Sequence, residues 1–215
     1  MADKIELILA INEMANYLNK ISRWYDSRQE PFGHIEGETQ TSYIYEFYCY
    51  MKFVEELSIA GNHIKFNYSG KKGPSFPKGP AEKDGGWAKF EITDLNGNLF
   101  DVCAGVKIHT QIDNYTYGAD ISIQSPAPIP SLNDVFLIVD AKYKTKPTEE
   151  LPIGQLREFR AVLQDLGFPK NIPASIKLTK TSFDEPTIVT NGQINANHIA
   201  YATQNKFKQI GNFHP

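Results

Sequence analysis

Five consecutive apolar residues between Asp134 and Asp140 constrain the fold of this chain more than any other segment. A strand that is buried on both faces has a continuous apolar centre of this kind, whereas a strand with one solvated face alternates. An amphipathic helix is predicted next, from Pro152 to Leu166, with proline in its first turn and Gly167 after its end. The combination predicts a mixed α/β domain built on a central sheet.

The remaining periodicities predict helices before this strand and further strands around it. Apolar residues recur at helical spacing over residues 3–25 and again from about 41 to 59, where Gly61-Asn62 ends the second helix. After Trp87 the spacing becomes that of strands, and Asn96-Gly97 predicts a hairpin. Residues 70–86, rich in Gly, Pro and Lys, are predicted to form a mobile loop. Additional strands are expected at 118–124, 176–178 and 187–189.

Composition excludes several classes of protein. The 215 residues carry a formal net charge of -3, which excludes a generally basic coat protein for nucleic acid but allows a local basic surface. Cys49 and Cys103 lie too far apart for a CxxC motif, and the five histidines show no zinc-binding spacing. No apolar run is long enough for a membrane span or a signal peptide. A soluble, cytoplasmic protein without a membrane partner is therefore expected.

Two acidic residues and a lysine fall at strand ends. Asp120 lies at the start of one predicted strand, and Asp140 and Lys142 end the next. Residues two apart on a strand point to the same side, so Asp140 and Lys142 project together, and Asp120 joins them if the strands are neighbours. Two adjacent carboxylates repel unless a cation lies between them, and oxygen ligands suit Mg²⁺ or Mn²⁺. Solvated residues at strand ends are the alternative, although burial beside five apolar residues would be costly for Asp140.

Two further polar residues interrupt apolar stripes. Glu46 lines up with the aromatic side of the second helix, opposite the expected solvent face with Lys52, Glu55 and Glu56. Gln155 shares a stripe with Phe159 on the later helix. Each residue taken singly is better explained as a partner of nearby backbone groups. Together with Asp120, Asp140 and Lys142, they form a more specific pattern.

That pattern resembles the PD-(D/E)xK nuclease superfamily, which has a restriction-endonuclease-like fold. Asp120 follows Ala119 where the family commonly has proline, and Asp140-Ala141-Lys142 has aspartate where glutamate is commoner. The run Asp-Ala-Lys-Tyr-Lys, and the aromatic segment 43–57, are similar to the nuclease subunit of McrBC-type restriction systems. The resemblance covers about residues 41–168. It implies an αβββαβ core, with a central mixed sheet flanked by helices, in a domain over 41–215 and an N-terminal helical region, 1–40, packed on that core.

The resemblance also implies roles for these residues. Asp120 and Asp140 would bind Mg²⁺, for which Mn²⁺ could substitute, with the Ala141 carbonyl as a further ligand and Glu46 contributing directly or through water. Lys142 would position or activate the attacking water, and Gln155 would hold the lysine or a phosphate. A separation of more than about 8 Å between the Asp120 and Asp140 carboxylates would exclude one shared ion, given metal–oxygen distances near 2 Å.

Two groups of basic residues are candidates for contacts with nucleic acid. The first lies in the Lys-rich loop and the second around the proposed site. They comprise Lys71, Lys72 and Lys78, followed by Lys144, Arg157 and Arg160. Solvated loop lysines are the alternative for the first group, and Glu149, Glu150 and Glu158 dilute the second.

These features together predict a metal-dependent endonuclease that hydrolyses DNA, most readily double-stranded, in a restriction or defence setting. A double-strand cut predicts a homodimer or membership of a larger defence complex, because each site cuts one strand. Two alternatives remain open from the sequence: a non-cleaving nucleic-acid-binding or interaction module of the same fold, and a structure-specific nuclease or RNase.

Overall fold

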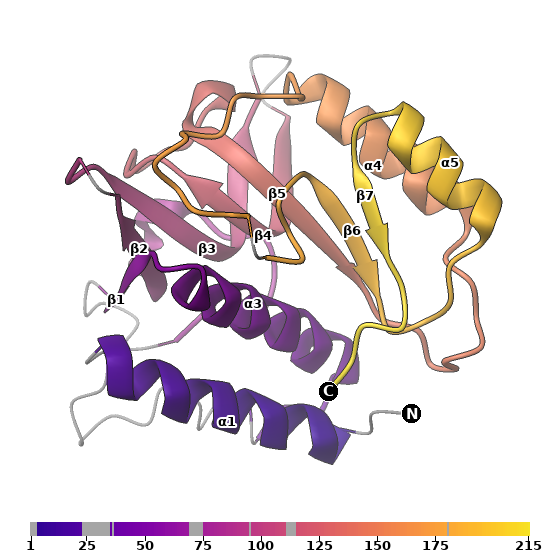
Figure 1. Cartoon of the computed structure of the whole chain (residues 1–215), viewed down its shortest axis with the longest axis horizontal. Helices are drawn as coiled ribbons and strands as arrows, with labels where there is room; N and C mark the ends of the chain where they lie inside the picture. The colour runs from indigo at the N-terminus through magenta and orange to yellow at the C-terminus, as the bar shows by residue number, and fades with distance from the viewer. Residues whose placement is uncertain are drawn as a thin grey trace.

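The computed structural model describes residues 4–22, 35, 37–68, 75–94, 96–110, 115–179 and 181–215. Within them the chain is a mixed α/β structure with four α-helices and a seven-stranded sheet (Figure 1). The helices are α1 (Lys4–Ser22), α3 (Thr41–Ile59), α4 (Ile153–Asp165) and α5 (Ala196–Gln204). The strands are β1 (His63–Asn67), β2 (Lys89–Thr93), β3 (Leu99–His109), β4 (Thr116–Gln124), β5 (Val135–Lys142), β6 (Thr187–Thr190) and β7 (Lys208–Ile210).

The strands lie in the sheet in the same order as in the chain, from β1 to β7. β1 to β5 form an antiparallel meander, and β5, β6 and β7 pair in parallel. Parallel neighbours need a long crossover connection. Helix α4 lies in the connection between β5 and β6, and α5 in the connection between β6 and β7. The sheet is therefore antiparallel in its first half and parallel in its second.

Helices pack on the sheet in two groups. Figure 1 shows α1 and α3 side by side, with α3 against the sheet, while α4 and α5 lie together near β6 and β7. One buried cluster joins α1, α3 and the apolar residues of β1 to β5, and includes Phe53, Phe90 and Val139. A second cluster joins α4 and α5 to the sheet around Ile138 and Ile188. The neighbours Ile138 and Val139 thus belong to different cores, which is why β5 is apolar along its whole centre.

The main sequence predictions of secondary structure are confirmed. Helix α3 has the predicted limits, the strands β2 and β3 flank the Asn96-Gly97 turn, and α4 lies within the predicted range. Helix α1 begins and ends within residues 3–25 and packs on α3 through Leu7, Ile11 and Leu18, which are buried. In the part of the chain that the structure describes, no helix combines the length and apolar character needed to cross a membrane.

Two predictions about irregular segments are wrong. Residues 176–178 are buried at Ile176 and Leu178 but form no strand. The side-chain oxygen of Asn62 accepts from the Lys177 N–H at 2.9 Å, and its amide donates to the Lys177 carbonyl at 2.8 Å, so a side chain takes the place of a neighbouring strand.

The described part of the predicted mobile loop, residues 75–86, is packed against the sheet. Ala81 forms backbone hydrogen bonds with β3, and Lys83 is only 4% exposed, with its Nζ 2.8 Å from Asp101. No residue in the loop itself indicates that Lys83 has a buried partner on β3.

Candidate active site

The three residues predicted from strand ends come together. The antiparallel register of β4 and β5 pairs Ile121 with Val139, so Asp120 and Asp140 come next along the two strands. The Ala141 N–H donates to Asp120 Oδ2 at 2.8 Å, and Lys142 Nζ lies 2.8 Å from Asp140 Oδ1. The predicted pairing of Asp140 with Lys142, and the approach of Asp120, are both present in this geometry.

The charge state of Asp120 reflects this crowding. Burial raises the pKa of Asp120 well above its usual range, and the charges of Asp140 and Glu46, with a hydrogen bond to Asp140, raise it further. Because the Asp120 and Asp140 carboxyl groups are within hydrogen-bonding distance, they lie well inside the limit of about 8 Å beyond which two carboxylates cannot share one ion. In the absence of a cation, the site therefore holds a proton where two carboxylates meet.

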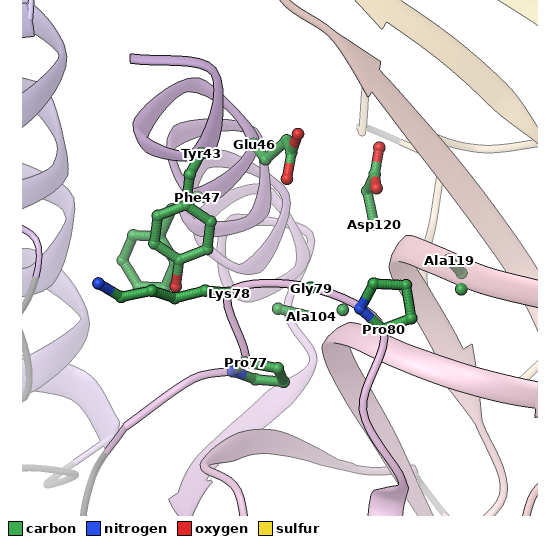
Figure 2. Close-up of a pocket in the computed structure, with 12 residues that line it drawn as sticks. Tyr43, Glu46, Phe47, Pro77, Lys78, Gly79, Pro80, Ala104, Ala119 and Asp120 are labelled. Atoms are coloured by element: carbon green, nitrogen blue, oxygen red, sulfur yellow. The ribbon is translucent and has the colours of Figure 1, made fainter. Parts of the chain in front are cut away.

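Glu46 extends from α3 toward the same place. Burial raises the pKa of Glu46 to about 7, a change that the ammonium of Lys142 opposes and the charge of Asp140 strengthens. Figure 2 shows the Glu46 and Asp120 carboxylates facing one space between α3 and the sheet. Glu46 is thus the third carboxylate of the site, as its position among the aromatic residues suggested.

Lys142 is the cation of this group. Burial would lower the pKa of Lys142, but the negative charges of Asp140, Asp120 and Glu46 outweigh burial and raise it. Lys142 is therefore an ammonium ion that can donate hydrogen bonds and neutralise negative charge, and it is poorly suited to removing a proton from water.

A pocket opens beside Glu46 and Asp120. Its walls come from α3, from residues 77–80 and from β3 and β4 (Figure 2). The lining residues are Tyr43, Glu46, Phe47, Pro77, Lys78, Gly79, Pro80, Ala104, Gly105, Gly118, Ala119 and Asp120. Its lining is apolar except at the two carboxylates, the Tyr43 hydroxyl and Lys78.

Glycines allow the wall formed by residues 77–80 to approach the sheet. A Cβ at Gly118 would lie 2.4 Å from Pro80 Cγ, and one at Gly105 would lie 3.3 Å from Pro77 Cβ. Gly105 also has φ +58, which other residues rarely adopt. The Ala81 N–H donates to the Gly105 carbonyl at 2.9 Å, so this wall is fixed by both hydrogen bonds and packing.

Gln155 contacts a different lysine from the one that the resemblance implies. Its side-chain oxygen accepts from Lys144 Nζ at 3.3 Å, and no hydrogen bond to Lys142 is present among the described residues. The Lys144 backbone is in turn held by Asn191, whose Oδ1 accepts from the Lys144 N–H at 2.6 Å. Gln155 therefore positions Lys144, the next lysine along the chain.

The other basic candidates are dispersed. Lys78 reaches the pocket and its Nζ lies 2.6 Å from Glu38 Oε2, while Arg157 is exposed and Arg160 half-buried on α4. Lys71 and Lys72 lie outside the described residues. Of the first basic group, Lys78 is the member whose position beside the site is defined.

The donor set fits one divalent cation. Three acidic side chains and one lysine leave the site with excess negative charge when the carboxyls are ionised, and Asp120 and Asp140 are hard oxygen donors. Among the described residues, no three or more His, Cys, Asp or Glu side chains are grouped so that they could hold a metal ion. The groups that would hold a metal are Asp120, Asp140 and the Ala141 carbonyl, and Glu46 faces the same space.

Two residues of the site are missing from the sequence-based selection. Tyr43 lies one helical turn before Glu46 and shares the pocket with it, a spacing that could have identified it. Glu38 is 6% exposed and binds Lys78, and its Oε1 accepts from the Thr39 and Gln40 N–H groups. No local sequence signal links Glu38 to a lysine forty residues later.

Comparisons of the chain with family models, curated proteins and solved structures found no match. Any functional conclusion therefore depends on the chemistry of Asp120, Asp140, Lys142 and Glu46 and on the elements that carry them.

Proposed function

We propose that this protein is a metal-dependent endonuclease that hydrolyses phosphodiester bonds of DNA, in a restriction or defence setting. The observation that carries the proposal is the contact of two carboxylates from adjacent strands, Asp120 and Asp140, beside the Lys142 ammonium and the Glu46 carboxyl. Carboxylates that share a site with one lysine suit a metal ion and an anionic substrate, such as a phosphodiester.

The order of elements around the site supports the proposal. With β1 and β2 set aside, which lie between α3 and β3 in the chain, the elements α3, β3, β4, β5, α4 and β6 have the order αβββαβ. Asp120 lies on the second strand of that series and Asp140 on the third. In this interpretation β1, β2, α5 and β7 extend the core, and α1 covers the outer side of α3.

A divalent metal, when bound by Asp120 and Asp140, would polarise a phosphate oxygen and lower the pKa of a water molecule. Lys142 donates hydrogen bonds to the attacking water and balances the negative charge that develops at phosphorus. Glu46, with a pKa near neutrality, accepts the proton that the water releases. Lys144, which Gln155 holds in position, contacts a second phosphate of the DNA strand. The water oxygen bonds to phosphorus in line with the 3′-oxygen as the bond between phosphorus and that oxygen breaks, and the 3′-oxygen takes a proton from solvent and leaves as an alcohol.

The test is incubation of the protein with plasmid, linear duplex and RNA, in parallel with Mg²⁺, Mn²⁺ and EDTA. We expect cleavage of DNA with either metal and none with EDTA. Asp140→Ala should abolish cleavage, and thermal unfolding of the variant should show a cooperative transition, as expected for a folded protein. The matched control is Asp184→Asn, because Asp184 also pairs with a lysine, Lys208, at 3.0 Å, but on a different part of the surface.

The choice of substrate distinguishes the nuclease proposal from the two alternatives, a ribonuclease and a non-cleaving module. Cleavage of RNA in preference to DNA would replace the proposal with a ribonuclease. Binding that weakens with salt, without any product under either metal, would support a non-cleaving module instead. Wild-type cleavage rates in a folded Asp140→Ala protein would exclude this site from the reaction.

A further inference from the structure

The Tyr43 hydroxyl is the buried polar group of the pocket that the proposed reaction leaves unused. Tyr43 is 6% exposed, and its hydroxyl oxygen is buried without a hydrogen-bond partner among the described residues. Figure 2 shows this oxygen inside the pocket, directed toward Lys78. Buried hydroxyls in folded proteins are nearly always paired, so an orphaned one at a pocket wall points to a ligand.

Lys78 supplies a second donor at the same wall. Its Nζ lies 2.6 Å from Glu38 Oε2, yet its side chain is 61% exposed. The other oxygen of Glu38 is occupied by the Thr39 and Gln40 N–H groups at 2.7 and 2.9 Å, which holds the carboxylate in place. A lysine ammonium has three N–H bonds, so the contact with Glu38 orients Lys78 and leaves donors directed outward.

A ligand that accepts hydrogen bonds from both the Tyr43 hydroxyl and the Lys78 ammonium must offer acceptor oxygens. Because Asp120 also lines the pocket, these oxygens would lie close to Asp120. Among the groups of a nucleic acid strand, non-bridging phosphate oxygens are the acceptors that Lys and Tyr side chains most often contact, and such contacts position the strand independently of sequence. A phosphate in the pocket would lie next to the phosphate that reacts at Asp120 and Asp140. The carboxylates nearby do not repel it when a cation and Lys142 balance them.

We propose that the pocket is a subsite for the phosphate adjoining the scissile one, with the Tyr43 hydroxyl and the Lys78 ammonium donating to its non-bridging oxygens. The inference rests on the proposed nuclease function and names a substrate contact within it. In this proposal Lys78 and Tyr43 are both substrate-binding residues, and Glu38 positions Lys78.

The experiment combines Tyr43→Phe with single methylphosphonate substitutions in a short duplex and its single strand. Binding is measured by fluorescence anisotropy in Ca²⁺, a cation with oxygen ligands that balances the carboxylates, and gel analysis of the recovered DNA verifies that it is intact. We expect Tyr43→Phe to weaken binding of unmodified DNA about tenfold, as for a hydrogen bond to a charged group. For the wild type, one methylphosphonate next to the cleavage position should weaken binding, and in Tyr43→Phe the same substitution should have little further effect.

Tyr45→Phe is the matched control. Tyr45 lies on the same helix and is fully buried, but its hydroxyl is beside Cys49 and it does not line the pocket. Tyr45→Phe should bind like the wild type, and Tyr43→Phe should retain full thermal stability because its hydroxyl makes no hydrogen bond with any described residue. A fall in affinity with unchanged stability therefore reports on the ligand.

The subsite and the nuclease function fail in different ways. Wild-type affinity and an unchanged methylphosphonate profile in Tyr43→Phe would overturn the subsite, even if the wild type cleaves DNA. Absence of cleavage with every metal, while Tyr43→Phe still weakens binding at one phosphate, would overturn the nuclease function and leave the pocket as a phosphate-binding site of a non-cleaving protein. A wild type that binds no nucleic acid overturns both.

Discussion

The charge on Lys142 distinguishes two roles that the sequence left together. The raised pKa of this lysine results from three surrounding carboxyls and keeps it protonated, so charge and hydrogen bonding are its contribution. Lys142→Met should lower the rate of DNA cleavage in Mg²⁺ by about 100-fold or more, the usual cost of losing a group that stabilises the transition state. Lys142→Arg keeps the charge and should recover part of the rate. Equal losses in both variants would indicate that a neutral amine is required.

Glu46 makes the stability of the metal-free protein depend on pH. Its pKa rises from 4.5 in the unfolded chain to about 7 in the folded protein, so the folded state favours the protonated form. The stabilisation is complete below about pH 4.5 and is lost as the pH rises through about 7. In EDTA, the wild type should therefore lose more free energy of unfolding between about pH 5 and pH 8 than Glu46→Gln does. Urea unfolding at both pH values measures this, and equal losses would contradict the buried position of Glu46.

The site residues that sequence predicted are those placed by local geometry. Asp140 and Lys142 meet because of strand alternation, and Asp120 joins them through the pairing of two neighbouring strands. Glu46 followed from helical spacing. Gln155 was expected to hold Lys142 or a phosphate; it contacts Lys144 instead of Lys142, because Asn191 fixes the chain after the strand, and its contact with a phosphate stays a prediction.

At the scale of elements, the close contact of residues 77–80 with β3 and β4 depends on residues without side chains. Gly118→Ala would place a methyl group 2.4 Å from Pro80 Cγ, so the wall must move. We expect a loss of about 1–3 kcal/mol in the free energy of unfolding, as for overpacking elsewhere, together with weaker DNA binding.

Gly154→Ala provides the control for that substitution. Gly154 lies in the first turn of α4 with open space around the added methyl group, so alanine should leave stability unchanged or raise it by up to about 1 kcal/mol. Thermal unfolding of both variants tests the difference. Similar unfolding midpoints for the two variants would show that residues 77–80 can move away from the added methyl group without a loss of stability.

Helix α3 is covered on more sides than its sequence pattern indicated. Glu56, predicted to be solvated, accepts hydrogen bonds from the Ser182 N–H at 2.6 Å and from Ser182 Oγ at 3.0 Å. Glu56→Ala should therefore destabilise the protein by about 1–3 kcal/mol, since two donors lose their acceptor. Glu55→Ala removes a surface ion pair with Lys52 and should cost less than about 1 kcal/mol. Denaturant unfolding ranks the two, and equal effects would contradict a special role for Glu56.

Elements were predictable where their own periodicity decided the structure. The limits of α3 and the β2–β3 hairpin follow from apolar spacing and turn residues close in sequence. The segment 176–178 has the composition of a strand, but its backbone is paired by Asn62, more than a hundred residues away. Strands β1 and β7 and helix α5 were not predicted, because each is short and lies at an edge of the molecule.

For the whole molecule, the charge distribution matters more than the net charge of -3. Buried lysines such as Lys83 are neutralised by acidic partners and add nothing to the attraction of DNA. The affinity for DNA should therefore show a shallow salt dependence, with a slope of about -0.9 for each phosphate that is neutralised. Lys78→Met should reduce the slope by about one, whereas Lys208→Met should not change it. Anisotropy titrations over a range of salt concentrations give both slopes, and an unchanged slope in Lys78→Met would exclude that contact.

The number of sites in the active assembly has a kinetic signature. One proposed site per chain cuts one strand, so a monomer produces nicked plasmid before linear plasmid. If a dimer is the active form, linear product should appear without accumulation of nicked circles, and its rate should rise more steeply than in proportion to protein concentration. Gel analysis of plasmid products over time measures both, and persistent nicking at every concentration would exclude a dimeric enzyme.

The sequential order of the strands has a consequence for how the protein is made. Each strand pairs with the next one synthesised, so β1 to β5 can assemble on α3 while the remainder is still on the ribosome. Asp120, Asp140 and Glu46 all belong to that earlier part, whereas α4 and β6 come later. The carboxylates would therefore gather before Gln155 and Asn191 are available to fix Lys144. Biosynthesis itself would then separate two stages, the assembly of the acidic centre and the completion of its basic side.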